Sequence, residues 1–258
     1  MLKLIEMLYQ ANIELISVNT DGVVIHYSEQ QRQTVLKIWK DWEKLTTYTL
    51  EDTYYNKIVF TSVNDYIAEI CDQKGNVLYY KFKGDFEIDK EPHKNNSQRI
   101  IPIALKEYFI NKVPLNKVIN NIGYEFINSK GNKELTSIYD YCIGKKKAKT
   151  QLYHYVTKGN HAIIKDKVIR YYIVDSNIYQ NKLFKEYKSG KRADKSNEKA
   201  LESLNKGFNH MLFMDYENKD NYNISKFYYH QECIKIIEPI ERNTRLRNGG
   251  KVEQLSLF

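Results

Sequence analysis

Apolar positions in the first 50 residues alternate between helical and extended spacing. Residues 2–11 repeat apolar side chains three or four positions apart, which predicts a helix that begins near the N-terminus. Two β-branched runs, 13–18 and 23–27, lie on either side of a short polar turn, and this pattern predicts a β-hairpin. Ser28-x-x-Gln31 has the form of a capping box, and the apolar positions from Val35 to Leu45 predict a second helix.

The pattern then becomes extended. Three runs, 57–60, 65–68 and 77–82, are rich in β-branched and aromatic residues and predict strands, the last two joined through the polar turn 73–76. Helices followed by neighbouring strands predict an α+β fold, in which helices cover one face of an antiparallel sheet.

Beyond Arg99 the spacing of apolar residues favours helices. Ile103, Ala104, Tyr108 and Phe109 share a helical spacing, and Pro114 marks the end of that helix. We therefore expect the chain beyond this point to be mainly helical.

Positive charge is concentrated in one segment. The chain has a net charge of +8 and a pI of about 9.0, which favours a polyanionic partner, either nucleic acid or an anionic membrane surface. Residues 145–199 hold 15 lysines and arginines against 5 acidic residues, and tyrosines are interspersed among them. Cations with interspersed rings suit a nucleic-acid surface, although a solvated helical face explains the pattern equally well.

The remaining composition excludes several classes of site. Three widely spaced cysteines form no Cys-x-x-Cys pair, so neither a zinc site nor a disulfide framework is indicated, and the scattered histidines show no metal-ligand spacing. No apolar run reaches the roughly 18 residues that span a bilayer, and no signal peptide is recognisable. We expect a soluble, cytoplasmic protein without a membrane partner.

The turn Asn19-Thr20-Asp21-Gly22 is the candidate for chemistry. A hairpin tip is an exposed and stiff support, and a carboxylate in such a place can hold a divalent cation, which prefers oxygen ligands. The alternative is that Asp21 only forms the turn, since aspartate is common in turns.

These segments together resemble the C-terminal part of a family B DNA polymerase of the bacteriophage type. The turn is similar to the third palm motif of that family, usually Asp-Thr-Asp-Ser. The resemblance implies that Asp21 is catalytic and that it holds, with Asn19 and Thr20, a pair of Mg²⁺ ions. Asn19 departs from the family pattern and removes a charge, although its amide still offers a carbonyl oxygen. Gly22 replaces the usual serine, which should ease the tight turn.

Further segments resemble the parts of the family that contact DNA. The strand with Lys57 corresponds to one that touches the primer–template minor groove, and run 81–87 is similar to the Lys-Gly-x-x-Glu segment that closes the palm. Runs 93–100 and 166–172 resemble the start of the thumb and a later thumb segment. The residues that the resemblance implies in DNA binding are Lys57, Lys83, Gly84, Lys94, Arg99, Lys167, Arg170 and Tyr171.

The run 254–258 carries three apolar groups, which is typical of a peptide that docks in an apolar groove. It is similar to the pentapeptide that binds the bacterial sliding clamp, and this implies clamp contacts by Gln254, Leu255, Leu257 and Phe258. On the same resemblance, residues 1–100 form the C-terminal portion of the palm, 101–240 a mainly helical thumb, and 241–258 a flexible tail with the clamp-binding peptide.

Two family motifs are missing from the 258 residues. Asp-x-x-Ser-Leu-Tyr-Pro supplies the other metal-binding carboxylate, and Lys-x-x-x-Asn-Ser-x-Tyr-Gly binds the incoming dNTP. Two metal ions held close together need more than one carboxylate. We therefore expect a DNA-directed DNA polymerase of DNA replication that is inactive as an isolated chain and is completed by an N-terminal polymerase half. That half should cover apolar surface around Ile16, Val18, Val23 and Ile25.

Two alternatives remain open. A DNA-binding, clamp-recruited accessory protein derived from a polymerase would bind DNA without catalysis. A metal-dependent nuclease would use Asp21 with Asp85, Glu87 and Asp89, the last three alternating along one expected strand.

Overall fold

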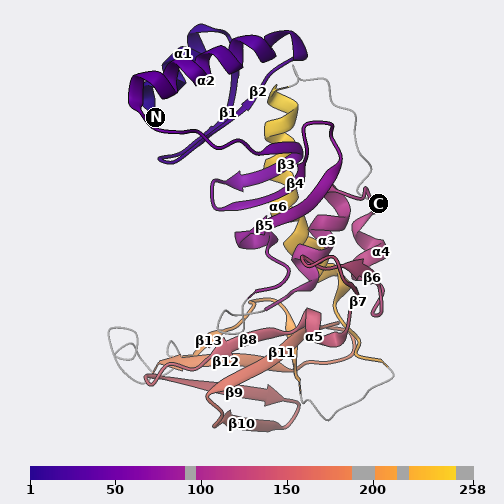
Figure 1. Cartoon of the computed structure of the whole chain (residues 1–258). Helices are drawn as coiled ribbons and strands as arrows, with labels where there is room; N and C mark the ends of the chain where they lie inside the picture. The colour runs from indigo at the N-terminus through magenta and orange to yellow at the C-terminus, as the bar shows by residue number, and fades with distance from the viewer. Residues whose placement is uncertain (91–96, 188–200, 214–220, 248–258) are drawn as a thin grey trace.

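The computed structural model describes residues 1–90, 97–187, 201–213 and 221–247, and it confirms a mixed α+β architecture with antiparallel sheets. Three parts follow one another along an elongated molecule, as Figure 1 shows. We call them the N-terminal unit (residues 1–50), the central unit (54–119) and the β-rich unit (125–213). The last helix of the chain connects all three.

The N-terminal unit confirms the predicted order of helix, hairpin and helix. Its elements are α1 (Leu2–Gln10), β1 (Glu14–Val18), β2 (Val23–His26), a 3₁₀ turn (Glu29–Gln31) and α2 (Arg32–Thr46). The capping box of Ser28 and Gln31 is formed. Both helices pack on one face of the hairpin, and the buried residues of this small core are Leu4, Leu8, Ile13, Val35, Ile38 and Trp42.

The central unit contains a three-stranded antiparallel sheet in the order β3-β4-β5, and its strands lie where the sequence predicted strands. Its elements are β3 (Tyr54–Ser62), β4 (Asp65–Cys71), β5 (Val77–Lys83), a 3₁₀ turn η2 (Gly84–Phe86), α3 (Ile100–Phe109) and α4 (Leu115–Ile119). Helix α3 is buried on nearly every side because its apolar residues are not confined to one stripe. It lies at the centre of the main core, which continues into the β-rich unit.

The β-rich unit contains two larger antiparallel sheets, in the orders β10-β9-β12-β13 and β14-β11-β8, and the hairpin β6-β7. Its elements are β6 (Glu125–Ile127), β7 (Lys133–Leu135), α5 (Ile138–Tyr141), β8 (Ile143–Lys146), β9 (Gln151–Thr157), β10 (Asn160–Ile164), β11 (Val168–Val174), β12 (Lys182–Tyr187), β13 (Leu201–Ser203) and β14 (Asn209–Leu212).

The expectation of a mainly helical region over 101–240 is therefore wrong for its described part. Strand β11 shows the physical reason. Apart from Arg170, its sequence Val-Ile-Arg-Tyr-Tyr-Ile-Val consists of β-branched and aromatic residues, and Tyr171 to Val174 are all buried, as in a strand that is covered on both faces. Because lysines separate the short apolar runs in this part of the chain, their extended spacing is hard to recognise in the sequence.

The expected strand with alternating Asp85, Glu87 and Asp89 is also absent. Gly84–Phe86 form the turn η2, and Glu87 follows as its C-cap. Asp89 instead accepts hydrogen bonds from Ser129 and Arg99. The three carboxylates therefore do not share the face of a strand, and the nuclease interpretation loses its basis.

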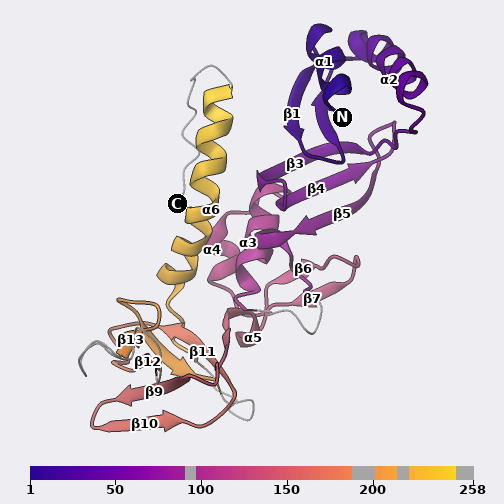
Figure 2. The same ribbon diagram turned by 90° about the vertical axis from the view of Figure 1, so that its left-hand side faces the viewer.

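Helix α6 (Lys226–Arg247) runs from the β-rich unit past the central unit towards the N-terminal unit, as Figures 1 and 2 show. Its first half is anchored in the main core, where the Tyr229 hydroxyl donates a 2.7 Å hydrogen bond to the Tyr141 carbonyl. Further along, Tyr108 of α3 donates to Glu241 at 2.5 Å. None of the helices in the described ranges combines the length and apolarity needed to cross a membrane.

Candidate functional site

The hairpin tip is held by the side chain of Asn19. Its Oδ1 accepts hydrogen bonds from the backbone N–H groups of Asp21 (2.9 Å) and Gly22 (2.6 Å), while its own N–H donates to the Gly22 carbonyl at 3.0 Å. This is an Asx-type turn, in which the amide oxygen replaces a backbone acceptor. The family resemblance made Asn19 a metal ligand, but a metal contact would have to displace one of these two hydrogen bonds.

Gly22 is not needed for backbone freedom. Neither Asp21 nor Gly22 has a positive φ, and a Cβ on Gly22 would meet Asn19 Oδ1 at an ordinary 3.7 Å. The expectation that glycine eases this turn is therefore wrong, and serine fits the same backbone. Asn19, Thr20 and Asp21 are all exposed, so the tip presents the Asp21 carboxylate to solvent.

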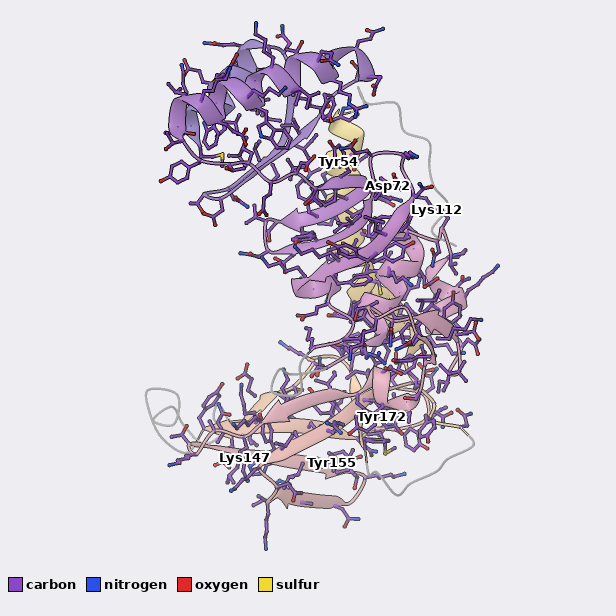
Figure 3. The ribbon with its side chains drawn as sticks, in the orientation of Figure 1. Tyr54, Asp72, Lys112, Lys147, Tyr155 and Tyr172 are labelled. Carbon is purple, nitrogen blue, oxygen red and sulfur yellow. The ribbon has the colours of Figure 1, made fainter. Side chains whose placement is uncertain are left out.

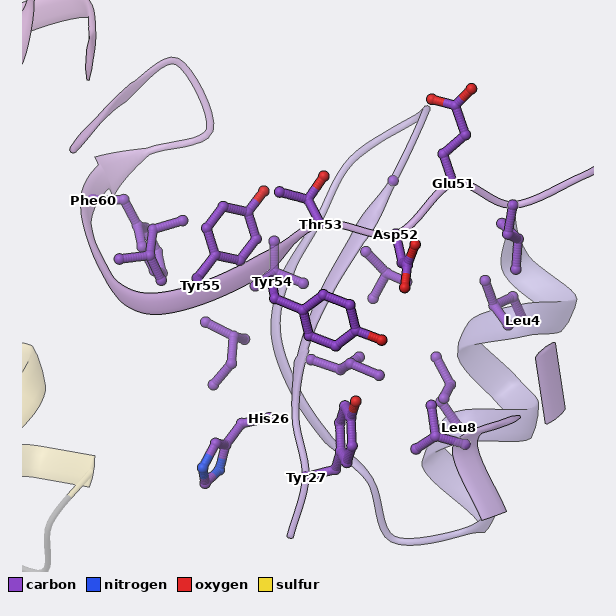
Figure 4. A pocket seen from close by; sticks show the side chains of 18 of the residues that line it. Leu4, Leu8, His26, Tyr27, Glu51, Asp52, Thr53, Tyr54, Tyr55 and Phe60 are labelled. Atoms are coloured by element: carbon purple, nitrogen blue, oxygen red, sulfur yellow. The ribbon is translucent and has the colours of Figure 1, made fainter. Parts of the chain in front are cut away.

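A pocket of about 1250 Å³ lies beside β2 and includes Asp21 in its lining. Helices α1 and α2 contribute apolar side chains, among them Leu4 and Ile38, and residues 49–60 form another part of the wall. Figure 4 shows how closely the segment 51–55 passes the hairpin. The end of α6 also lines this pocket, through Ile240 and Thr244. The pocket therefore lies between the N-terminal unit and the rest of the molecule.

Two polar contacts fix the wall opposite β2. Glu43 of α2 accepts a 2.8 Å hydrogen bond from the backbone N–H of Leu50, and this bond lowers the pKa of the Glu43 carboxyl. The Tyr54 hydroxyl hydrogen-bonds to Asp52, which raises the pKa of Tyr54, and its ring lies near Tyr27 in Figure 4. The pocket wall thus presents carboxylates and phenols as well as apolar groups.

Of the four apolar hairpin residues that were expected to be exposed, only Val18 is clearly so, at 42%. Ile16, Val23 and Ile25 are partly buried and line the pocket. Strand β2 pairs with β1 alone among the described strands, so its other edge faces this pocket without a strand partner. The apolar surface expected there is therefore a hollow beside a free strand edge.

As a metal site, the tip is incomplete. Within the described ranges no group of three or more His, Cys, Asp or Glu side chains is placed to hold a metal ion. Asp21 can supply carboxylate oxygens of the kind that Mg²⁺ prefers, but a pair of ions needs ligands from elsewhere.

Lys57 lies on β3 opposite Glu69, and its ammonium donates to the Phe109 carbonyl at the end of α3. Burial, together with the neighbouring ammonium of Lys112, lowers the pKa of Lys57 to about 8. Its side chain is therefore engaged within the central unit, and a DNA contact would need it to leave the helix end.

Gly84, which the resemblance implied in DNA binding, has a structural role in the turn after β5. Its φ is +65°, and a Cβ there would come within 1.9 Å of Asp65 Oδ1 and 2.6 Å of the Asn64 carbonyl oxygen. Asp65 in turn accepts from the Ser62 hydroxyl and from the Asp85 N–H. Lys83 directly before it ends β5 and is exposed.

Arg99 is the centre of an ion cluster rather than a surface cation. Its guanidinium donates to Asp89 (2.6 Å), Glu134 (2.7 Å) and Asp140 (3.2 Å), and its side chain is 16% exposed. Burial opposes its charge, but the hydrogen bonds to Glu134 and Asp89 outweigh burial and raise the pKa of Arg99. The three carboxylates take up the N–H groups of the guanidinium, so Arg99, which was expected to bind DNA, is not presented to a phosphate.

The thumb residues are placed unequally. Tyr171 is fully buried and donates a 2.7 Å hydrogen bond to Asn205 Oδ1. The guanidinium carbon of Arg170 lies 4.2 Å from the centre of the Tyr139 ring, whereas Lys167 is exposed directly before β11. Lys94 and the clamp-binding residues Gln254, Leu255, Leu257 and Phe258 lie outside the described residues.

The interspersed tyrosines largely serve the core. Tyr153, Tyr171 and Tyr172 are buried, and Tyr155, partly buried, hydrogen-bonds to the His210 carbonyl. Figure 3 shows Tyr155 and Tyr172 within the β-rich unit and Lys147 towards its end. These four rings are therefore not presented as a stacking surface, while many lysines between them are exposed.

Two features of the site could not be predicted from the sequence. The pocket beside β2 combines segments that are far apart along the chain, so no local motif could reveal it. Two of the partners of Arg99, Glu134 and Asp140, are 35 and 41 residues away from it along the chain. Comparison of the chain with protein-family models, with curated proteins and with solved structures gave no match.

Proposed function

We propose that this chain is the palm and thumb portion of a family B DNA-directed DNA polymerase, completed by a separate or missing N-terminal half in the cytoplasm of the host cell. The observation that supports the proposal best is the place of Asp21. It stands exposed at the tip of a two-stranded sheet and beside a large, partly apolar pocket.

The free edge of β2 is the proposed contact for the other half. An unpaired edge presents N–H and C=O groups that an added strand can bond, and apolar pockets beside it receive alternate side chains. Leu4, Val35 and Ile38 already line such a space. A strand that carries the missing carboxylate would pack there close to Asp21.

In the completed site, Asp21 and Thr20 would hold Mg²⁺ together with ligands from the other half. When bound, the two ions supply activation of the primer 3′-hydroxyl and stabilisation of the leaving pyrophosphate. Asn19 would keep its role in the turn and hold the Asp21 backbone in place through its two hydrogen bonds. The dNTP would be positioned by the fingers of the other half.

The β-rich unit would act as the thumb. Exposed lysines such as Lys146, Lys165 and Lys167 can contact duplex phosphates, which fixes position without reading sequence. The run 254–258 would bind the sliding clamp, and this tether would raise the effective concentration of enzyme at the primer end.

The test is reconstitution. The chain is co-expressed with the N-terminal half of a phage-type family B polymerase that is cut before its own third palm motif, and primer extension is measured with Mg²⁺. We expect extension only by the pair. Asp21→Ala should lower it by at least about a hundredfold, because a charge-stabilising group at the reacting centre is lost. Asp41→Ala, which changes an exposed aspartate on α2, is the matched control and should extend like the parent.

Two outcomes would contradict the proposal. Extension by the chain alone that depends on Asp21 would show that no partner is needed. DNA binding that is indifferent to Mg²⁺ and to Asp21→Ala, without extension by the pair, would favour a non-catalytic, clamp-recruited accessory protein. The engagement of Asn19 Oδ1 within the turn is the observation that favours this second function.

A further inference from the structure

A cluster of titratable side chains that the proposed function does not use crosses the four-stranded sheet of the β-rich unit. His154 on β9 lies between His161 on β10 and Glu186 on β12. Its Nδ1 is 2.8 Å from His161 Nε2, and its Nε2 is 2.7 Å from Glu186 Oε2. The chain thus places two imidazoles and a carboxylate in one continuous row.

The strand register fixes this row. His154 is opposite Ile163 on β10 and opposite Phe184 on β12. His161 and Glu186 are each two positions from those partners, so all three side chains lie on the same face as diagonal neighbours. His154 is buried and His161 is exposed on the edge strand β10, so the row opens to solvent on the His161 side.

The carboxylate determines the tautomer of His154. Glu186 accepts a hydrogen bond, so Nε2 of His154 carries the hydrogen and Nδ1 keeps a lone pair that faces His161. An N–H of His161 can donate to this lone pair, and a metal ion placed between the two imidazoles would satisfy both facing nitrogens as well. A carboxylate on the far nitrogen is also the usual support of a metal-ligating histidine, because it fixes the ring and raises its basicity.

We propose that His154 Nδ1 and His161 Nε2 bind a divalent transition-metal ion such as Zn²⁺, and that Glu186 orients His154 for this purpose. Imidazole nitrogen suits Zn²⁺, Cu²⁺ and Ni²⁺. Two nitrogens at tetrahedral angles around Zn²⁺ lie roughly 3.3 Å apart, so the pair must separate by about half an ångström. The exposed His161 ring has room to make this movement.

Water completes the coordination. No group of three or more metal-ligating side chains exists in the described part of the chain, so the protein contributes two direct ligands. Such a site is open, unlike a closed structural zinc site with four protein ligands. The bound ion would tie the edge strand β10 to β9, and it would stabilise the folded chain because it binds that state preferentially. The inference does not rest on the polymerase proposal.

The experiment titrates the full chain with Zn²⁺ by calorimetry. We expect one tight binding event, which His161→Gln abolishes and Glu186→Gln weakens by about 10- to 100-fold. His26→Gln is the matched control, because His26 contacts the carboxylate of Glu14 at 2.9 Å and has no second imidazole in the described contacts. That variant should bind Zn²⁺ like the parent. Cys71, Cys142 and Cys233 are buried, which keeps their thiols from competing in the folded chain.

Thermal unfolding provides an independent readout. Without Zn²⁺ His161→Gln should unfold at or slightly below the temperature of the parent, because buried His154 loses its 2.8 Å contact with His161, and added Zn²⁺ should raise the transition of the parent only. The proposal is overturned if His161→Gln binds Zn²⁺ as the parent does, or if His26→Gln loses as much binding. An unchanged affinity in Glu186→Gln would overturn the orienting role of that carboxylate.

Discussion

At the scale of single residues, Gly84 is the position where the backbone leaves least choice. It combines a positive φ with a space that Asp65 and the Asn64 carbonyl already fill. We expect Gly84→Ala to lower the free energy of unfolding by about 3 kcal/mol, because a left-handed backbone costs an L-residue about 1–2 kcal/mol and the close contacts must also move.

Gly159→Ala separates these two costs. Gly159 also has a positive φ, at +81°, but a Cβ there would meet nothing within 4 Å. Gly159→Ala should therefore cost only the backbone contribution of about 1–2 kcal/mol. Urea unfolding of both variants measures the difference, and equal losses would show that Asp65 moves aside without cost.

Arg99 is the second residue at which the structure makes a sharp prediction. Arg99→Leu leaves Asp140, which is 5% exposed, without its cation, so the free energy of unfolding should fall by about 3 kcal/mol at neutral pH. Arg32→Leu is the control, because Arg32 pairs with Glu29 on the surface and its loss should change little.

The same cluster predicts how stability depends on pH. Burial raises the pKa of Asp89 and of Glu134, but the hydrogen bonds from Ser129, Arg99 and Asn128 outweigh burial and lower both pKa values below their ordinary 3.8 and 4.5. A lowered pKa contributes stability above the ordinary value, and this contribution is lost as the pH falls through the lowered one. Between about pH 5 and pH 2 the parent should lose more stability than Arg99→Leu, and parallel curves would contradict this.

At the scale of elements, the sequence predicted the fold where one signal acted alone. The N-terminal helix, the hairpin, the capping box and the three central strands all follow from local spacing, and the structure has each of them. In the β-rich unit the apolar runs are short and are separated by many lysines, so the extended pattern is weak in the sequence. Strands β9 and β11 carry Tyr153, Tyr171 and Tyr172 into the core, where the sequence suggested a stacking surface.

The candidate site was predictable only in part for a related reason. The turn around Asp21 is a local motif, and it stands exposed at a hairpin tip as expected. The Arg99 cluster includes Glu134 and Asp140, which are 35 and 41 residues from Arg99, and the histidine row includes Glu186, which is 32 residues from His154. Spacing along one chain cannot reveal a diagonal across three strands.

At the scale of the whole molecule, the two separate cores bear on stability. The N-terminal unit buries six core residues of its own, whereas the main core extends from β3 to α6. Small cores stabilise a unit weakly, and a hairpin with a free edge gains little by itself. The pocket beside β2 is therefore the place where a bound partner would add most to the stability of this unit.

Net charge is the property of the whole molecule that DNA binding tests most directly. Lys146, Lys165 and Lys167 form an exposed lysine corner where β8 meets the start of β11, since Lys146 is opposite Val168 and the Lys167 carbonyl accepts from the Lys147 N–H at 2.8 Å. If the corner contacts duplex phosphates, log K for primer–template DNA falls with log salt by about 0.9 for each contact. Changing the three lysines to glutamine should make that slope shallower by about 2 to 3 between roughly 50 and 200 mM salt.

A triple change on α2 is the matched control for this experiment. Lys37, Lys40 and Lys44 are exposed, and replacing them by glutamine removes the same net charge from the opposite end of the molecule. Fluorescence anisotropy with labelled duplex measures both slopes. If the chain responds to its total charge alone, the two triple variants will weaken alike. A shallower slope in the lysine corner variant alone would instead localise the phosphate contacts to the β-rich unit. The α2 variant keeps the lysine corner, so it would still release the counterions that these contacts displace from DNA.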